Sequence, residues 1–315
     1  MSRGARGWTE NDIPDLTGRI FIVTGANSGI GYEAARALAV KGGHVVLACR
    51  SREKGEAAAA RIRSVHPRAE VQVSELDVAS LGSVRAFADR FLREHGRLDV
   101  LVNNAGVMAI PRRETVDGFE MQIGTNHLGH FALTGLLLAR IFESAPSRVV
   151  TVSSMQHAYG SFGALDAADL RLDHGYTKWG AYQRSKLANL YFAYELQRRL
   201  EIDHPGVMSI ACHPGYAATN LQGVGPAMSG SSVEGAVMAV GNKLFAQSAR
   251  SGALPTMYAA LAEGLRGGEF IGPSGPMALW GAPVSQKSNR LSRDLYAAKK
   301  LWETSEELTG VKYAF

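Results

Sequence analysis

The chain has few cysteines and no long hydrophobic run. Only two cysteines, Cys49 and Cys212, occur among its 315 residues, and each lies in an apolar segment. Two such thiols fit reduced, packed side chains better than a disulfide framework or a metal site. No run of about 18 apolar residues is present to form a spanning helix, and residues 1–8 lack the apolar core of a signal peptide. We therefore expect a cytoplasmic protein without a membrane span.

Strong charge of one sign is also missing. The formal net charge is +5 and is dispersed along the chain, and no basic run resembles a nucleic-acid-binding tract. His157, His174 and His213 are not spaced as a metal-ligand set, so we expect no metal site. An apolar fraction of 46% is that of a globular protein with a substantial core.

Short runs rich in Val, Ile and Leu alternate with helix-like segments, and no Pro/Ser-rich linker interrupts them. The expected strands span 19–24, 44–49, 71–76, 98–103, 147–153 and 207–212, with 269–271 as a candidate seventh. The expected helices span 30–41, 52–65, 80–95, 114–143, 180–203, 232–247 and 290–308. This alternation predicts an α/β fold with a Rossmann-type, doubly wound parallel sheet of about seven strands and helices on both faces. Residues 1–17 are expected to form an N-terminal tail and 18–315 a single domain.

A glycine-rich turn follows the first expected strand. The run Gly25-Ala26-Asn27-Ser28-Gly29-Ile30-Gly31 joins that strand to a helix-forming segment. Strand, glycine turn and helix together are the context in which glycines indicate dinucleotide binding. Gly25 permits the tight turn, Gly29 lets the backbone approach a pyrophosphate, and Gly31 lets the helix pack against the strand. The spacing is Gly-x-x-x-Gly-x-Gly, and an ordinary turn before a helix is the alternative.

Tyr182 and Lys186 lie four residues apart in an expected helix, so their side chains share one face. A phenol with a free pKa of about 10 exchanges protons poorly near neutral pH. A nearby ammonium favours the phenolate and lowers that pKa. The pair can therefore serve as a general acid/base. An ordinary surface pair is the alternative, because this spacing arises by chance in many helices.

Five motifs occur in a fixed order along the chain. They are Thr24-Gly25-x-x-x-Gly29-x-Gly31, Asn103-Asn104-Ala105-Gly106, Ser153-Ser154, Tyr182-x-x-x-Lys186 and Pro214-Gly215. Through them the chain resembles the classical short-chain dehydrogenase/reductase family from about residue 16 to the C-terminus. The runs Thr-Asn-His-Leu-Gly-His-Phe at 125–131 and Tyr-Gln-Arg-Ser-Lys-Leu-Ala-Asn at 182–189 resemble its retinol-dehydrogenase-like branch.

The resemblance implies hydride transfer by a cofactor, with the protein handling the proton. Tyr182 would exchange a proton with the substrate oxygen, and Lys186 would bind the nicotinamide ribose and lower the tyrosine pKa. A serine would hydrogen-bond and polarise that oxygen, with Ser154 favoured over Ser153. Asn126 would help hold a water chain from the lysine to solvent; an ordinary polar helix residue is the alternative.

The end of the second expected strand distinguishes NAD from NADP. An acid there would bind the free ribose hydroxyl of NAD, whereas an arginine would accept the 2′-phosphate of NADP. By family alignment the acid position is Cys49, and Arg50 follows with a planar guanidinium that suits phosphate. We therefore predict NADP(H), with a solvated surface charge as the alternative for Arg50.

Further cofactor contacts follow from the resemblance. Asp77 would hold the adenine amino group, although it could also be a simple turn residue, and Thr219 would bond the carboxamide. The complete expected set is Gly25, Asn27, Ser28, Gly29, Ile30, Gly31, Arg50, Asp77, Val78, Asn104, Ala105, Gly106, Tyr182, Lys186, Pro214, Gly215 and Thr219.

Two segments are expected to shape the substrate site. The stretch 156–179 separates Ser154 from Tyr182 more widely than in a minimal classical enzyme, as in retinol-dehydrogenase-like members, and would form one wall. Residues 220–232 are rich in Gly, Ser and small apolar residues, so a mobile substrate loop is expected over about 216–240, with a plain flexible connection as the alternative. Apolar residues such as Met108, Ile110, Met155 and Leu221 could line the site.

The expected function is NADP-dependent interconversion of an alcohol and a carbonyl on a small-to-medium lipophilic substrate. The alternatives are an NAD-dependent member of the same family, a non-catalytic dinucleotide-binding sensor, and an NAD-linked epimerase or dehydratase. Apolar residues of the helix holding Tyr182 could build a homodimer face or pack internally.

Overall fold

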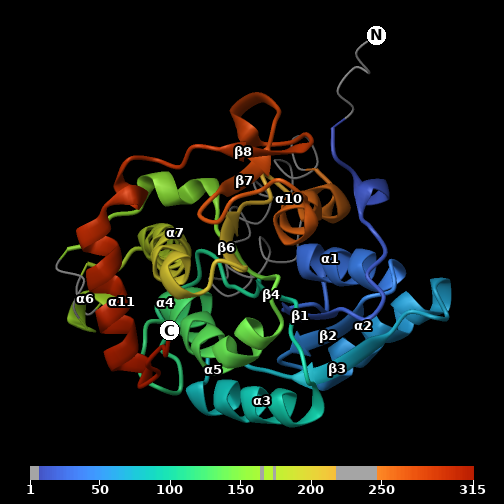
Figure 1. Ribbon diagram of the computed structural model, residues 1–315. Coiled ribbons are helices and arrows are strands. Elements are labelled where there is room, and N and C mark those ends of the chain that lie inside the picture. The colour runs from blue at the N-terminus through green and yellow to red at the C-terminus, as the bar shows by residue number, and fades with distance from the viewer. Residues whose placement is uncertain (1–6, 164–166, 173–174, 218–246) are drawn as a thin grey trace.

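The computed structural model describes residues 7–163, 167–172, 175–217 and 247–315. At its centre is one eight-stranded sheet in the order β3-β2-β1-β4-β5-β6-β7-β8 (Figure 1). The strands are β1 (Ile20–Thr24), β2 (His44–Cys49), β3 (Val71–Glu75), β4 (Val100–Asn103), β5 (Ser147–Val152), β6 (Val207–Cys212), β7 (Phe270–Pro273) and β8 (Pro283–Gln286). All neighbours from β3 to β7 pair in parallel, and β8 pairs antiparallel to β7.

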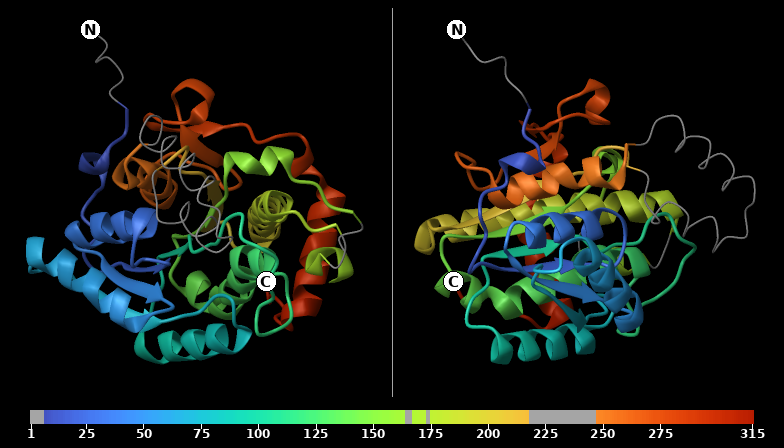
Figure 2. Two further views of the ribbon diagram at one scale, coloured as in Figure 1. Left: turned by 180° about the vertical axis from the view of Figure 1, so that it is seen from behind. Right: turned by 90° about the vertical axis from the view of Figure 1, so that its right-hand side faces the viewer.

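Helices cover both faces of this sheet (Figures 1 and 2). The longer ones are α1 (Gly29–Val40), α2 (Arg52–Val65), α3 (Leu81–Glu94), α5 (Gly129–Glu143), α7 (Lys178–Asp203), α10 (Ala249–Leu261) and α11 (Leu295–Thr309). The shorter ones are α4 (Met121–Ile123), α6 (Ala167–Arg171), the 3₁₀ turns η1 (Glu10–Asp12), η3 (Met155–Tyr159), η4 (Pro276–Ala278) and η5 (Leu291–Arg293), and the π-helix η2 (Gly124–Leu128).

The central strands are apolar throughout because both of their faces are buried. In β1, Phe21 and Val23 pack in the core beneath α1, α2 and α10, whereas Ile22 packs in the core beneath α3, α5 and α7. The expected doubly wound α/β fold is confirmed. The strand order reverses direction between β1 and β4, and ligands of such sheets bind at the carboxyl ends of the strands beside that point.

Some elements differ from the expectation. The sheet has an eighth strand, β8, whose short sequence Pro-Val-Ser-Gln carries no apolar run. The helix expected over 114–143 begins at Met121 and contains the π-helix η2, because Glu114 and Glu120 pair across a bridge instead. The helix expected over 232–247 lies mostly outside the described residues. The pattern missed α10, which contains Pro255 and Gly252 in its interior.

Two terminal segments pack onto this framework. Near the N-terminus, Trp8 contacts Tyr258 of α10 edge-on, with ring centroids 5.4 Å apart. At the other end, α11 packs across α7 (Figure 1), where Ala298 and Leu301 share a core with Leu187 of α7. None of the helices in the described part of the chain combines the length and apolarity that crossing a membrane requires.

Candidate active site

The glycine turn after β1 has the geometry of a dinucleotide cradle. Gly25 and Gly29 adopt φ values of +67° and +58°, which favour glycine. A Cβ on Gly31 would lie 2.5 Å from Asn104 Nδ2 and 2.6 Å from the Gly25 carbonyl oxygen, so only glycine fits there. Ser28 precedes α1 without capping it through its side chain, which leaves the first N–H groups of the helix available to an anion.

Thr24 and Asn104 join this turn to the end of β4. Asn104 Nδ2 donates to the Thr24 carbonyl at 2.7 Å. The backbone N–H groups of Asn104 and Ala105 both donate to Thr24 Oγ1 at 2.8 Å. The next residue, Gly106, faces the catalytic candidates, because a Cβ there would lie 2.9 Å from Asn126 Oδ1 and 3.8 Å from Lys186 Nζ. The expected cofactor residues of β1 and β4 thus lie together.

The ends of β2 and β3 border the same turn. Cys49 is buried, and its sulfur accepts hydrogen bonds from the backbone of Ala26 and Asn27, while burial raises the pKa of its thiol to about 11. Arg50 is exposed, and no ion pair joins it to any other described residue. After β3, Asp77 Oδ1 accepts from the backbone N–H two residues later at 3.0 Å, which is the arrangement of a turn residue. The end of β2 therefore carries a neutral thiol in place of a carboxylate, followed by a guanidinium that forms no ion pair with a described residue.

Tyr182, Ser154 and Lys186 meet between β5 and α7. Tyr182 is buried, and its phenol lies close enough to the Ser154 side chain for that side chain to lower the phenol pKa. Ser153 instead donates to the Lys186 carbonyl at 2.7 Å and is fully buried, so its hydroxyl has a structural partner. Lys186 Nζ donates to the Val152 carbonyl at 3.1 Å and lies 5.7 Å from the Tyr182 ring centroid. The geometry favours Ser154 over Ser153 as the serine that faces the phenol.

Burial dominates the electrostatics of this group. It raises the pKa of Tyr182 to about 12, against the opposing hydrogen bond with Ser154. It also lowers the pKa of Lys186 to about 8. The expected lowering of the tyrosine pKa by Lys186 is not seen in this structure, where the ammonium group bonds the Val152 carbonyl. Tyr182 is therefore protonated at neutral pH.

Asn126 lies in η2 and braces the site. Its Oδ1 accepts from the Val107 N–H at 2.8 Å, and its Nδ2 donates to the Val107 carbonyl at 2.9 Å and to Ser185 Oγ at 2.8 Å. Ser185 Oγ in turn donates to the Tyr182 carbonyl at 2.7 Å. Both amide hydrogens are thus used within the protein. The side chain ties the loop after β4 to the catalytic face of α7.

His213 supports the turn after β6. Its buried ring accepts from the Gly215 N–H at 3.2 Å through Nδ1, and Nε2 lies 2.9 Å from Gln286 Oε1 on β8. Gly215 has a φ of +68°, and a Cβ there would meet the Leu279 carbonyl at 2.3 Å. The expected residues Pro214 and Gly215 are thus held at the carboxyl edge of the sheet. Thr219, Leu221 and most of the 216–240 loop lie outside the described residues.

Sequence reasoning missed the polar residues that fasten the expected substrate wall. Gln122 Oε1 accepts from the Ala109 N–H at 2.8 Å, and its Nε2 donates to Tyr176 Oη at 3.0 Å and to the Lys178 carbonyl at 2.9 Å. Tyr176 Oη donates to the Ile110 carbonyl at 2.7 Å. A glutamine between Met121 and Ile123 in an apolar stretch was the available signal. These bonds join the insertion to the loop that contains Ile110.

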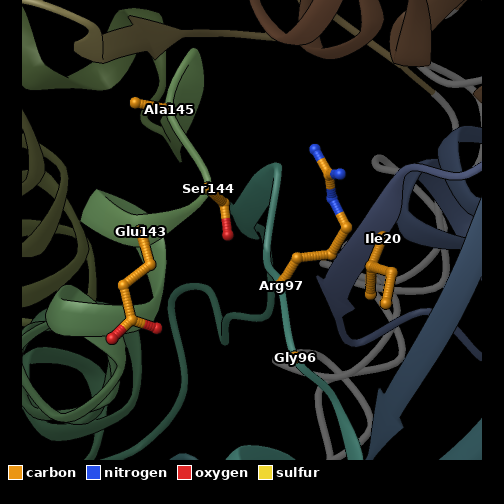
Figure 3. Close-up of a pocket in the computed structure, with 6 residues that line it drawn as sticks. All are labelled: Ile20, Gly96, Arg97, Glu143, Ser144 and Ala145. Atoms are coloured by element: carbon orange, nitrogen blue, oxygen red, sulfur yellow. The ribbon is translucent and has the colours of Figure 1, made fainter.

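A separate hollow of about 510 Å³ lies at the amino ends of the strands, on the side of the sheet away from the candidate site (Figure 3). It is lined by Ile20, Gly96, Arg97, Glu143, Ser144 and Ala145, which are at the amino ends of β1, β4 and β5 or just before them. Arg97 is paired with Asp99 at 2.6 Å, and Ser144 Oγ accepts from the Leu98 N–H at 2.7 Å. These side chains serve the fold. Across the described ranges, no cluster of three or more His, Cys, Asp or Glu residues could hold a metal ion.

Comparisons with known proteins agree with the geometry. A family model described as short chain dehydrogenase matches residues 19–165. Retinol dehydrogenase 12 from Homo sapiens is 41% identical to this chain, and the match covers 95% of this chain and 88% of the relative. The crystal structure of an uncharacterized protein from Mycobacterium paratuberculosis is 42% identical, with a TM-score of 0.80 over 98% of this chain and all of the other.

A more distant solved structure shares the fold. It is a short chain dehydrogenase from Shigella flexneri complexed with NADP, 23% identical, with a TM-score of 0.61 over 82% of this chain and 98% of the other. The close relatives match nearly the whole chain, including the segments on both sides of Tyr182. The chain therefore belongs to the short-chain dehydrogenase/reductase family, in its retinol-dehydrogenase-like branch, and is an oxidoreductase of alcohols and carbonyls that uses a nicotinamide dinucleotide.

Proposed function

We propose that this protein is an NADP-dependent oxidoreductase that interconverts an alcohol and a carbonyl on a small-to-medium lipophilic substrate, with Tyr182 as general acid/base. One observation carries the proposal: a buried, protonated Tyr182 lies against Ser154 and within reach of Lys186, beside the glycine cradle. A phenol in such a position can give its proton to a carbonyl oxygen in reduction and take it back in oxidation.

Each residue of the group has a separate task. When bound, the nicotinamide supplies or accepts the hydride. The Ser154 hydroxyl, which lies beside the Tyr182 phenol, orients the substrate oxygen toward that phenol. Lys186 would hold the nicotinamide ribose through its ammonium hydrogens. Asn126 keeps α7 in register with the loop after β4 through Ser185 and Val107.

The preference for NADP rests on the end of β2. Cys49 is neutral and buried beneath the glycine turn, whereas Arg50 is exposed with no ion pair to a described residue. A carboxylate at the position of Cys49 would repel a 2′-phosphate, and a free guanidinium next to it would bind one in a bidentate manner.

The preference for a lipophilic substrate rests on the walls beside Tyr182. Trp179 packs edge-on against the Tyr182 ring at 6.2 Å between centroids. Met155 follows Ser154 directly and remains partly exposed, and Ile110 is held by Tyr176. An apolar surround of this kind excludes water from the developing oxyanion and favours an apolar substrate. The name of the human relative, a retinol dehydrogenase, agrees with such a substrate class.

A substrate panel tests the proposal. Purified protein is mixed with NADPH and a series of lipophilic aldehydes and ketones, and NADPH consumption is followed by absorbance; alcohols are run with NADP⁺ in parallel. We expect turnover with at least one apolar carbonyl. Tight NADPH binding with no turnover across the panel would instead support a dinucleotide sensor, and redox-neutral conversion of a sugar nucleotide would support an epimerase.

A further inference from the structure

His130 connects the end of β1, which leads into the glycine turn, with Asn126 beside the Tyr182 group. It lies in α5 and is fully buried. Its Nε2 lies 2.9 Å from Thr24 Oγ1 at the end of β1, and its Nδ1 lies 3.2 Å from the backbone carbonyl oxygen of Asn126. The ring thus bridges the strand that leads into the glycine cradle and the residue that braces Tyr182 through Ser185.

The partners of the ring determine where its proton sits. A carbonyl oxygen can only accept, so Nδ1 carries a hydrogen and donates to Asn126. Burial lowers the pKa of His130 to about 4, with the Lys186 charge acting in the same direction, so the ring is neutral near pH 7. Nε2 is then unprotonated and must accept from the Thr24 hydroxyl.

Thr24 is satisfied in a complementary way. Its hydroxyl oxygen accepts from the N–H groups of Asn104 and Ala105 at 2.8 Å, which uses both lone pairs. Its single hydrogen is left for His130 Nε2 at 2.9 Å, since the contact with the Val102 carbonyl is longer, at 3.3 Å. The chain of hydrogen bonds therefore runs in one direction, from the Asn104–Ala105 turn through Thr24 and His130 to Asn126.

We propose that His130 is a positioning residue which, as the neutral Nδ1–H tautomer, holds the Thr24–Asn104–Ala105 cofactor cradle in register with Asn126. This inference rests on the proposed function for its effect on turnover, but its effect on cofactor binding stands separately. The bond to Thr24 positions the cofactor cradle. The bond to Asn126 positions the residue that is linked to Tyr182 through Ser185. The two bonds should therefore influence different kinetic constants.

Two substitutions separate the bonds. His130→Asn places an amide nitrogen at the same number of bonds from Cβ as Nδ1, so it can donate to Asn126 but cannot reach Thr24. His130→Gln places an amide oxygen at the same number of bonds as Nε2, so it can accept from Thr24 but loses the bond to Asn126. We expect the Asn variant to bind NADPH about tenfold more weakly, and the Gln variant to lose about tenfold in kcat with NADPH affinity near wild type.

The chain supplies a matched control in His127, three residues earlier. It is also buried, but its Nε2 bonds Ser305 of α11 at 2.8 Å instead of a residue of the cradle. His127→Gln can keep that bond, so we expect wild-type NADPH affinity and kcat, whatever happens to the melting temperature. Thr24→Val removes the hydroxyl from the other end of the bond to His130 and should also weaken NADPH binding. Adding His130→Asn to Thr24→Val should weaken that binding little further.

A spectroscopic measurement on the wild type tests the tautomer of His130 directly. In protein labelled with ¹⁵N-histidine, long-range ¹H–¹⁵N spectra distinguish the two neutral tautomers, and the His130 signals are assigned by their loss in His130→Gln or His130→Asn. An Nε2–H or charged ring at pH 7 would overturn the proposal. So would Asn and Gln variants that lose NADPH affinity and kcat equally and in proportion to their melting temperatures, which is the pattern of a packing role.

The two proposals fail in different ways. If the wild type turns over no carbonyl, the proposed function fails, while the NADPH titrations and the tautomer still decide the role of His130 in the cradle. If turnover is present but both His130 variants bind NADPH and react as the wild type does, His130 has no positioning role and the proposed function stands.

Discussion

At the scale of single residues, the proposed chemistry depends on how burial shifts the pKa values of two residues on one helix. Tyr182 and Lys186 are both buried, and burial disfavours the charged form of each. The phenol therefore stays protonated, while the ammonium becomes easier to deprotonate. The sequence predicted which residues meet, through their four-residue spacing. It could not predict that the lysine would bond the Val152 carbonyl, because that contact depends on β5 and not on the helix.

The first prediction concerns the proton itself. Tyr182→Phe removes the hydroxyl and keeps the ring, so the Trp179 contact should survive and NADPH should still bind. Turnover should fall by about 10²–10⁴-fold, the range of general acid/base catalysis. Tyr191→Phe is the control, since Tyr191 is also buried on α7 but packs near Phe162. Steady-state rates measure the turnover of both variants, and fluorescence titrations measure their NADPH affinity. A Tyr182→Phe variant that kept half of wild-type turnover when chemistry is rate-limiting would show that Tyr182 is not the general acid/base.

The second prediction concerns the charge of Lys186. With a pKa of about 8, its ammonium form is lost as the pH rises through that value. An uncharged amine has fewer hydrogens to donate and no charge to attract the cofactor. We expect NADPH to bind progressively more weakly between pH 7 and pH 9. Lys186→Met should bind more weakly at pH 7 and show no such slope. Fluorescence titrations across this range provide the measurement, and parallel slopes for both proteins would contradict the assignment.

At the scale of elements, the strands were predictable and the connections between distant segments were not. Apolar runs that end at Gly25, Asn103 and Ser153 located the carboxyl edge of the sheet correctly, because local composition alone sets those boundaries. The π-helix η2 was not predictable. It follows α4, whose start is capped by the buried Glu120 carboxylate, and a Cβ on Gly124 would lie 2.6 Å from Thr115 Cγ2. The close approach of Gly124 to Thr115 depends on how the chain folds back before α4, which the apolar pattern does not encode.

The apolar residues of α7 illustrate the same limit. They fitted either a homodimer face or internal packing on sequence grounds. In the structure, Leu187, Ala188 and Tyr191 share a core with Ala298 and Leu301 of α11. Internal packing against α11 therefore accounts for this part of the helix, and dimerisation stays a prediction.

The third prediction belongs to the end of β2. Arg50 is exposed there, without an ion pair to a described residue, and we expect NADPH to bind at least several-fold more tightly than NADH. Arg50→Ala should reduce this difference in affinity, because it should weaken the binding of NADPH and leave the binding of NADH unchanged. Arg68→Ala is the matched control, because it removes the same charge from an exposed position before the amino end of β3. Equal affinities of the wild type for the two cofactors, or an equal effect of both variants, would refute the role of Arg50.

At the scale of the whole molecule, buried neutral histidines join elements that are far apart in the chain. His127 links η2 to α11 through Ser305, His130 links α5 to β1 through Thr24, and His213 links the end of β6 to β8 through Gln286. Burial lowers the pKa of His127 to about 3 and that of both others to about 4. The polar ties between these distant elements therefore carry uncharged rings near pH 7.

The fourth prediction follows from these lowered pKa values. The unfolded chain binds a proton at each of these histidines below about pH 6.5, whereas the folded protein does not do so until about pH 4 or lower. Because the unfolded state then binds more protons, the free energy of unfolding must decrease as the pH falls from 6.5 toward 4. Each histidine should contribute about 2 kcal/mol to the loss between pH 7 and pH 5.

A single substitution isolates one such contribution. His127→Gln can keep the bond to Ser305 and removes one titrating ring, so its loss of unfolding free energy between pH 7 and pH 5 should be smaller than that of the wild type by about 2 kcal/mol. Carboxylates contribute equally to both proteins and cancel in the comparison. Urea titrations at the two pH values measure the difference. If His127→Gln and the wild type lost the same free energy, the buried ring would have to be protonated in the folded state already at pH 5, and the neutral histidine ties inferred from its packing would be wrong.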